Sequence, residues 1–237
     1  KQDWPQLLIV SFVGMLGYFA FSVFGFRYAP AGVGTLIFST QPMIIAILAS
    51  LAGMEKLSST TLVGLVISFI GSILLVWGNG NGLDTKVGFE TAIGCILIFF
   101  AGLAFSIFVV FSKSLIQHYG ALKITGISNA LIALPMIPFV KWETLTALSN
   151  LEQKEIFALV FLTTLGATAS VVAWNYAAGI LRPTLLGSSL YIIPIIAVAA
   201  GWAMLNEAIT FNTIVAAAII LAGVAISQIK ARTASTA

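Results

Sequence analysis

Charged residues are scarce in this chain. Only 8% of its 237 residues are Asp, Glu, Lys or Arg, whereas a water-soluble domain carries about 25%. Hydrophobic residues make up 59% of the chain. A water-soluble core of this length does not need so much apolar surface, so the composition indicates that most of the chain lies in a lipid bilayer.

Residues that carry catalysis or bind metals are also few. Cys95 and His118 are the single cysteine and histidine, so the sequence offers no disulfide and no cysteine-based metal site. The apolar runs hold no pair of carboxylates, and no glycine-rich nucleotide loop is present. Basic residues are scattered, which argues against a nucleic-acid partner. We therefore expect no enzyme, no cofactor and no metal site.

The apolar residues form long continuous runs. About 20 mostly apolar residues cross the bilayer as a helix, and the runs do not alternate as the strands of a membrane barrel do. The sequence thus predicts an all-α membrane protein with eight transmembrane helices, at about 7–26, 31–53, 60–78, 88–112, 122–140, 155–179, 184–204 and 211–229.

The positions of Lys and Arg predict the orientation. Seven of them lie on the side of the two termini, and four lie on the other side. Because positive residues favour the cytoplasm, we expect both termini to be cytoplasmic, with residues 230–237 as a cytoplasmic tail, in the cell inner (plasma) membrane.

One spacing recurs along the chain. Pro42, Glu55 and Gly71 return as Pro194, Glu207 and Gly223, each 152 positions later (194−42, 207−55, 223−71).

Five spans separate the two copies, and an odd number inverts the orientation, so the pattern indicates an inverted repeat. We expect residues 1–80 to form a first repeat with three spans and residues 88–229 a second with five. By this symmetry the natural protein has ten helices (5+5), of which these are the last eight.

Polar residues near mid-span mark a candidate site. Pro42 and Pro194 each remove a backbone donor and shape the helix around them, and such a defect survives in lipid only if it is buried or faces a cavity. The alternative is that proline and serine serve helix packing there. We expect the substrate-binding residues to be Tyr18, Gln41, Trp174, Asn175, Ser188 and Tyr191.

Some of these residues have a second interpretation. The amide of Gln41 either bonds a neighbouring helix or lines a cavity, because an unpaired amide in an apolar medium costs several kcal/mol. Trp174 lies near a span end, where aromatic residues also serve as interfacial anchors.

Glu55 and Glu207 each follow a span, where a carboxylate can cap the next helix.

Two spans carry faces of small residues, around Gly64 and Gly71 in one and around Ala216 and Gly223 in the other. Such faces let helices approach closely. The two faces pack either against each other within one subunit or between two subunits. In the second case the protein forms a homodimer.

The stretch from Arg27-Tyr28-Ala29-Pro30 through Pro42 to Glu55 resembles the EamA-type transporters of the drug/metabolite transporter superfamily, and Arg182-Pro183 through Pro194 to Glu207 repeats the pattern. The resemblance implies ten helices in two inverted repeats around a central cavity. It also implies export or exchange of small metabolites such as amino acids.

We therefore expect a secondary transporter of small neutral or zwitterionic metabolites that works by alternating access. The alternative is a non-transporting helical membrane protein, such as an assembly factor or a subunit of a larger membrane complex.

Overall fold

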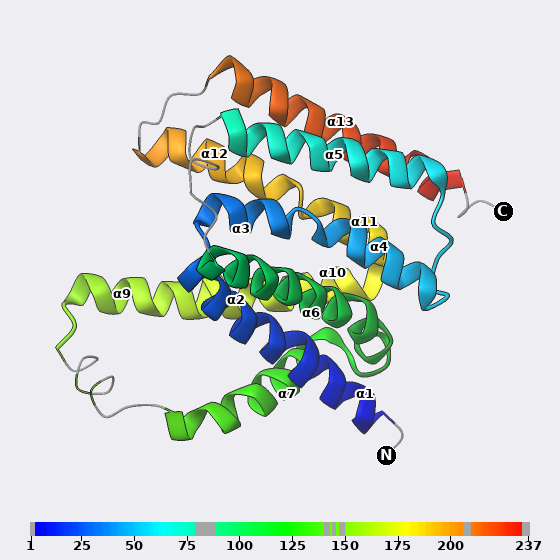
Figure 1. Ribbon diagram of the computed structural model, residues 1–237. Helices are drawn as coiled ribbons and strands as arrows, with labels where there is room; N and C mark the ends of the chain where they lie inside the picture. Colours follow the sequence, from blue (N-terminus) through cyan, green and yellow to red (C-terminus); the bar gives the residue numbers. More distant parts are fainter. Residues whose placement is uncertain are drawn as a thin grey trace.

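The computed structural model describes residues 3–78, 89–139, 143, 146, 150–205 and 210–233, almost all of them helical (Figure 1). Within these residues, eight helical stretches are long and apolar enough to cross a membrane, which confirms the all-α membrane fold. They are Trp4–Tyr28, Ala31–Leu51, Ser59–Val76, Phe89–Tyr119, Ala121–Pro138, Gln153–Ile180, Pro183–Met204 and Phe211–Gln228.

Several spans consist of more than one helical segment. The first span comprises α1 (Trp4–Leu8), the wide π-helical turn η1 (Ile9–Leu16) and α2 (Gly17–Tyr28), and the second comprises α3 (Ala31–Phe38) and α4 (Gln41–Leu51). The remaining elements are α5 (Ser59–Gly78), α6 (Phe89–Tyr119), α7 (Ala121–Ala133), η2 (Leu134–Phe139), α9 (Gln153–Phe161), η3 (Leu162–Ala169), α10 (Ser170–Ile180), α11 (Pro183–Ser189), α12 (Ile192–Leu205) and α13 (Phe211–Thr233).

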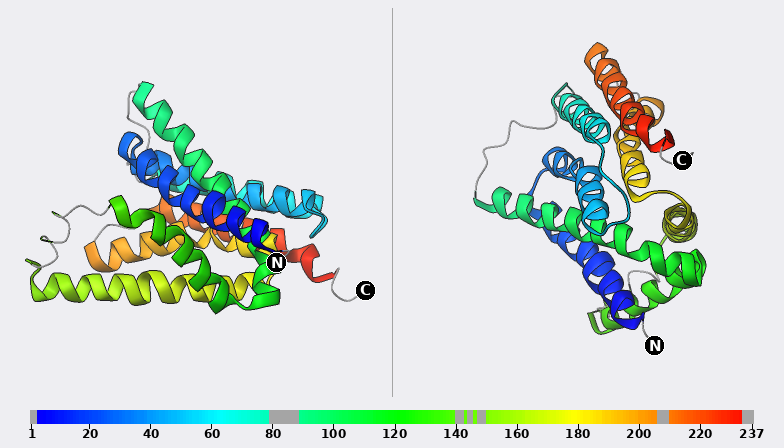
Figure 2. Two further views of the ribbon diagram at one scale, coloured as in Figure 1. Left: turned by 90° about the horizontal axis from the view of Figure 1, so that it is seen from below. Right: turned by 90° about the vertical axis from the view of Figure 1, so that its right-hand side faces the viewer.

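The longest helix, α6, lies at the centre of the bundle. It packs against the first span on one side and against α3 and α4 on the other (Figure 2, right). Its end differs from the prediction, because residues 113–119 continue the helix instead of forming a loop. Leu115 and Ile116 are buried there, so the helix is held by packing until Gly120, whose φ of 88° ends it.

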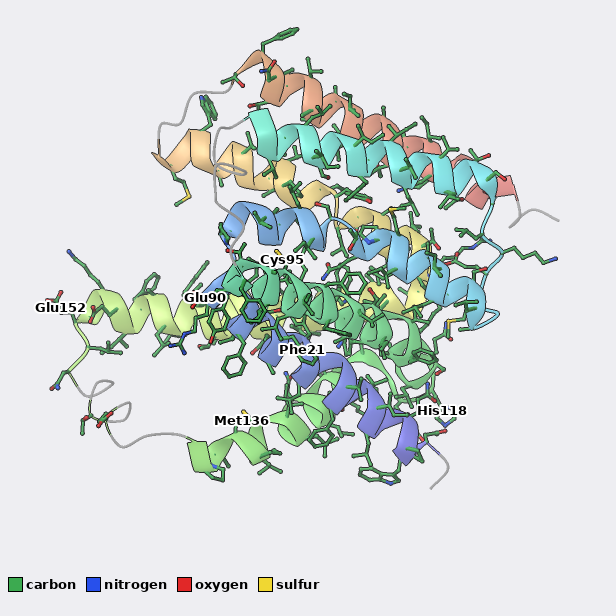
Figure 3. All side chains as sticks on the ribbon, viewed as in Figure 1. Phe21, Glu90, Cys95, His118, Met136 and Glu152 are labelled. Carbon is green, nitrogen blue, oxygen red and sulfur yellow. The ribbon has the colours of Figure 1, made fainter. Side chains whose placement is uncertain are left out.

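Both described ends of the chain lie at one end of the bundle (Figure 1). We call this the terminus side, and the opposite end the far side. His118, near the end of α6, is on the terminus side, and Glu152, at the start of α9, is on the far side (Figure 3).

Two helices from distant parts of the sequence, α5 and α13, lie side by side along their length (Figure 1). Their small-residue faces meet within one subunit. A Cβ atom on Gly64 would lie 2.6 Å from the Gly223 carbonyl oxygen, and one on Gly223 would lie 2.4 Å from Ser68 Oγ. Ser68 Oγ donates a hydrogen bond to the Ile220 carbonyl at 3.1 Å.

Candidate functional site

A cavity of about 470 Å³ lies in the middle of the bundle. Side chains from five of the eight spans line it. They are Met15, Tyr18, Thr35, Phe38, Ser39, Gln41, Pro42, Phe105, Phe108, Ser170, Val171, Trp174, Leu190, Tyr191, Ile193 and Pro194.

The 152-residue spacing relates residues across this cavity. Ten of the lining residues form five pairs at that spacing: Tyr18 with Ser170, Phe38 with Leu190, Ser39 with Tyr191, Gln41 with Ile193, and Pro42 with Pro194. Ser68 and Ile220, which are hydrogen-bonded between α5 and α13, have the same spacing (220−68). Positions that repeat in sequence therefore face each other in space.

Two of the cavity-lining spans, Ala31–Leu51 and Pro183–Met204, are interrupted beside the cavity. Helix α3 ends at Phe38 and α4 begins at Gln41, while α11 ends at Ser189 and α12 begins at Ile192. Pro42 and Pro194 lie in the first turn after each break, where the missing N–H costs least.

Hydroxyl groups satisfy carbonyl oxygens around both breaks. Ser39 Oγ donates to the Thr35 carbonyl at 3.0 Å, and Ser189 Oγ donates to the Leu186 carbonyl at 2.6 Å. In an apolar medium these bonds replace the water that an interrupted helix would otherwise need. The polar residues at the breaks are thus used partly by the helices themselves.

Aromatic rings form one continuous wall of the cavity. The ring centroids of Tyr18 and Phe105 are 5.1 Å apart, those of Phe105 and Trp174 are 5.7 Å apart, and those of Tyr18 and Phe38 are 6.1 Å apart. These spacings are typical of attractive tilted ring contacts. The wall offers an apolar face together with the Tyr18 hydroxyl and the indole of Trp174.

The polar groups of the cavity are neutral, and among the residues that the structure describes no charged side chain lines it. Gln41 is 7% exposed and lies over Gly102 of α6, where a Cβ atom would meet its Cγ at 3.2 Å. Among the described residues, the buried Nε1 of Trp174 has no hydrogen-bond acceptor. Tyr191, 1% exposed, donates to the Leu65 carbonyl at 3.2 Å. The cavity can therefore offer the amide of Gln41 to a neutral polar group.

The structure brings together six of the eight residues singled out in the sequence: Tyr18, Gln41, Pro42, Trp174, Tyr191 and Pro194.

Asn175 and Ser188 lie elsewhere. Asn175 is next to Trp174 and so about 100° around the helix, and its Nδ2 donates to Thr125 Oγ1 of α7 at 2.7 Å. Ser188 is fully buried in α11, where it donates to the Leu185 carbonyl and accepts from Gln228.

Sequence reasoning missed most of the apolar lining. Phe105 and Phe108 of α6 face the cavity, but phenylalanine is so common in membrane spans that nothing distinguishes them. Ser170 and Ile193 are different, because the 152-residue spacing applied to Tyr18 and Gln41 gives both positions. Adding 152 to the number of a predicted site residue would therefore have found Ser170 and Ile193 from the sequence.

Glu55 follows α4, but it caps a different helix from the one expected. Its Oε1 accepts from the backbone N–H of Thr184 at 2.7 Å and from the Thr184 hydroxyl, at the start of α11. The following helix, α5, is capped by Ser58 instead, whose Oγ accepts from the Thr61 N–H at 3.1 Å. Glu207 lies outside the described residues.

Eight helical spans, five of which line a central cavity, define a helical membrane protein in which residues 152 positions apart line one cavity. The chain belongs to the EamA-like transporter family, which matches residues 1–77 and 92–228. This confirms the resemblance seen in the sequence.

Individual relatives are distant but cover nearly the whole chain. An uncharacterized transporter of Archaeoglobus fulgidus is 23% identical over 94% of this chain and 77% of its own length. A probable amino-acid metabolite efflux pump of Salmonella typhimurium is 22% identical over 93% of this chain and 75% of its own length. A solved crystal structure shares the fold, with a TM-score of 0.81 and 20% identity over 98% of this chain and 79% of the other.

Proposed function

We propose that this protein is a secondary transporter, an exporter or exchanger, of small neutral or zwitterionic metabolites such as amino acids. The observation that carries the proposal is the central cavity, lined by repeat-related residues of both halves of the chain. Inverted repeats around a mid-membrane site are the usual build of secondary transporters, in which the two halves move against each other to expose the site alternately.

The lining supports this substrate class. A phosphorylated substrate normally needs Arg or Lys, and none of the described Arg and Lys residues lines the cavity. The wall of Tyr18, Phe105 and Trp174 suits an apolar side chain, or a cationic group over a ring face. Gln41 supplies an amide donor and acceptor for the polar end of the solute. The naming of the Salmonella relative as an amino-acid metabolite efflux pump agrees with this assignment.

We further propose the ten-helix architecture, with residues 1–80 and 88–229 as the two repeats. Burial supports it. None of the most apolar window of the span Gln153–Ile180 is buried, whereas its counterpart, Trp4–Tyr28, is covered by α6. Two further helices related to α6 and α7 would cover this bare span by the same symmetry.

We also propose the membrane and the orientation. The protein lies in the cell inner (plasma) membrane, and its terminus side faces the cytoplasm. The count of Lys and Arg supports it.

Flux measurements in lipid vesicles test the transport function. The protein is reconstituted, and the movement of labelled amino acids and other neutral metabolites is followed against vesicles without protein. Gln41→Leu should lower the flux, while the matched change Gln153→Leu, at an exposed amide on the far side, should not. If a broad panel shows no flux above background, and the protein instead co-purifies with one stable partner without any solute-dependent thermal shift, then the non-transporting alternative is correct.

A further inference from the structure

The cavity is closed on the terminus side by contacts between the two halves of the chain. Helices α4 and α11 pack there, and a Cβ atom on Gly187 would lie 3.1 Å from Ile45 Cγ2. Ile45 and Ala49 are fully buried, and Leu186 is 3% exposed. The position related to Gly187 by the repeat, Thr35, is exposed and lines the cavity. The two sides of the cavity are therefore in different states, although their residues are related by the repeat.

One polar link crosses this closed side. The carboxylate of Glu55 accepts both the backbone N–H and the hydroxyl of Thr184, which lies on the first turn of α11. A carboxylate at this place meets two donors and the positive end of the helix dipole. Gly53, with a φ of 70°, turns the chain after α4 so that Glu55 can reach α11.

Charges beside the link hold the same region in place. The Lys113 ammonium of α6 donates to the Leu181 carbonyl, in the turn that leads into α11. Lys113 lies within electrostatic range of both Glu55 and Arg182. Two elements thus fix the start of α11: α6 through Lys113, and the α4–α5 connection through Glu55.

We propose that Glu55 is a latch between the two halves, which holds the cavity closed towards the terminus side until α11 separates from α4. The link joins residues 129 positions apart, so it is a tertiary contact and not part of either helix. Its place is the entrance on that side, between the membrane surface and the buried Ser188. Its role in a transport cycle rests on the proposed function, but the closure itself does not.

Thiol reactivity tests the closure without any substrate. In a protein with Cys95→Ala, Ser188→Cys reports access from the terminus side, because Ser188 is fully buried one turn beyond Thr184. Glu55→Ala removes two hydrogen bonds to a charged group, and the loss of one already shifts an opening equilibrium about tenfold. We therefore expect Glu55→Ala to raise the rate of modification by a membrane-impermeant reagent at least tenfold. Glu55→Gln should give a smaller increase, since its amide oxygen can still accept both hydrogen bonds and only the charge is lost.

Two controls separate a latch from general loosening. Ser128→Cys lies buried between α7 and η1, away from the link, and should stay unreactive in the same variants. Glu155→Gln removes a capping carboxylate from the start of α9 and should leave Ser188→Cys protected. Equal rates at Ser188→Cys with and without Glu55 would overturn the proposal, as would an equal rise at Ser128→Cys. Because no solute is used, a chain that fails to transport still gives a clear answer.

Discussion

Adding one methyl group to Gly223 is expected to destabilise the pairing of α5 with α13. The new Cβ atom would lie 2.4 Å from Ser68 Oγ and 2.5 Å from the Ser68 backbone nitrogen. A normal contact needs about 1 Å more, and the backbone nitrogen cannot rotate away, so the two helices must move apart. Overpacking of this kind costs about 1–3 kcal/mol.

The glycines of this helix pair form a graded series. A Cβ atom on Gly64 meets the Ser227 backbone nitrogen at 2.3 Å, so Gly64→Ala should be as harmful as Gly223→Ala. Gly71→Ala is expected to cost less, because its nearest contacts are longer, at 2.8 Å to Ile220 Cγ1 and 2.9 Å to the Ile220 backbone nitrogen. Gly126 of α7 has nothing within 4 Å, so Gly126→Ala should be neutral or stabilise by about 0.5 kcal/mol through helix propensity.

Thermal unfolding of the purified variants in detergent tests the series. A loss of about 2 kcal/mol lowers the melting temperature of a chain of this size by about 4–8 °C. The expected order of melting temperature is Gly126→Ala highest, then Gly71→Ala, with Gly64→Ala and Gly223→Ala lowest. Melting temperatures for the last two that equal that of Gly126→Ala would refute the close approach of α5 and α13.

Three further outcomes are expected. Gln41→Leu should lower flux at least tenfold with an unchanged melting temperature, because it removes a cavity amide and keeps the volume; wild-type flux with equal protein in the membrane would place the site elsewhere. Asn175→Ala should cost about 1–2 kcal/mol of stability in the thermal assay and leave the substrate KM unchanged, since Asn175 bonds Thr125 and does not line the cavity. An impermeant thiol reagent outside intact cells should label Glu152→Cys but not Gln117→Cys, and the reverse pattern would invert the orientation.

The sequence predicted the spans well because their signal is local. Continuous apolar runs need no tertiary information, and the eight predicted spans match the structure within a few residues at most ends. The largest error is at the end of α6, where the predicted span stopped at residue 112, before the polar residues Lys113 and Gln117. Both side chains donate to carbonyls of the α10–α11 region, so polar residues are accommodated while the helix continues.

The site was harder to predict because it depends on which face of each helix points inward. Depth in the membrane selected Trp174 and Asn175 equally, yet one lines the cavity and its neighbour bonds α7. The partner of Glu55 was also beyond reach, since Thr184 is 129 positions away and no local pattern joins them. Position along a span can be read from one sequence, but the direction of a side chain is set by packing.

Under the proposed repeat, one sequence pattern gives two different surfaces. Related residues meet symmetrically where α5 and α13 cross, since Ser68 and Ile220 face each other there. They differ at the two entrances of the cavity, where Gly187 is packed on Ile45 while Thr35 is exposed. Gly187 has no side chain, so α11 can approach α4 closely on the terminus side. Thr35, at the related position of α3, carries a side chain that prevents an equally close approach on the far side. This difference between the two copies of the pattern fits a cavity that is closed towards the terminus side, and the proposed latch of Glu55 adds to that preference.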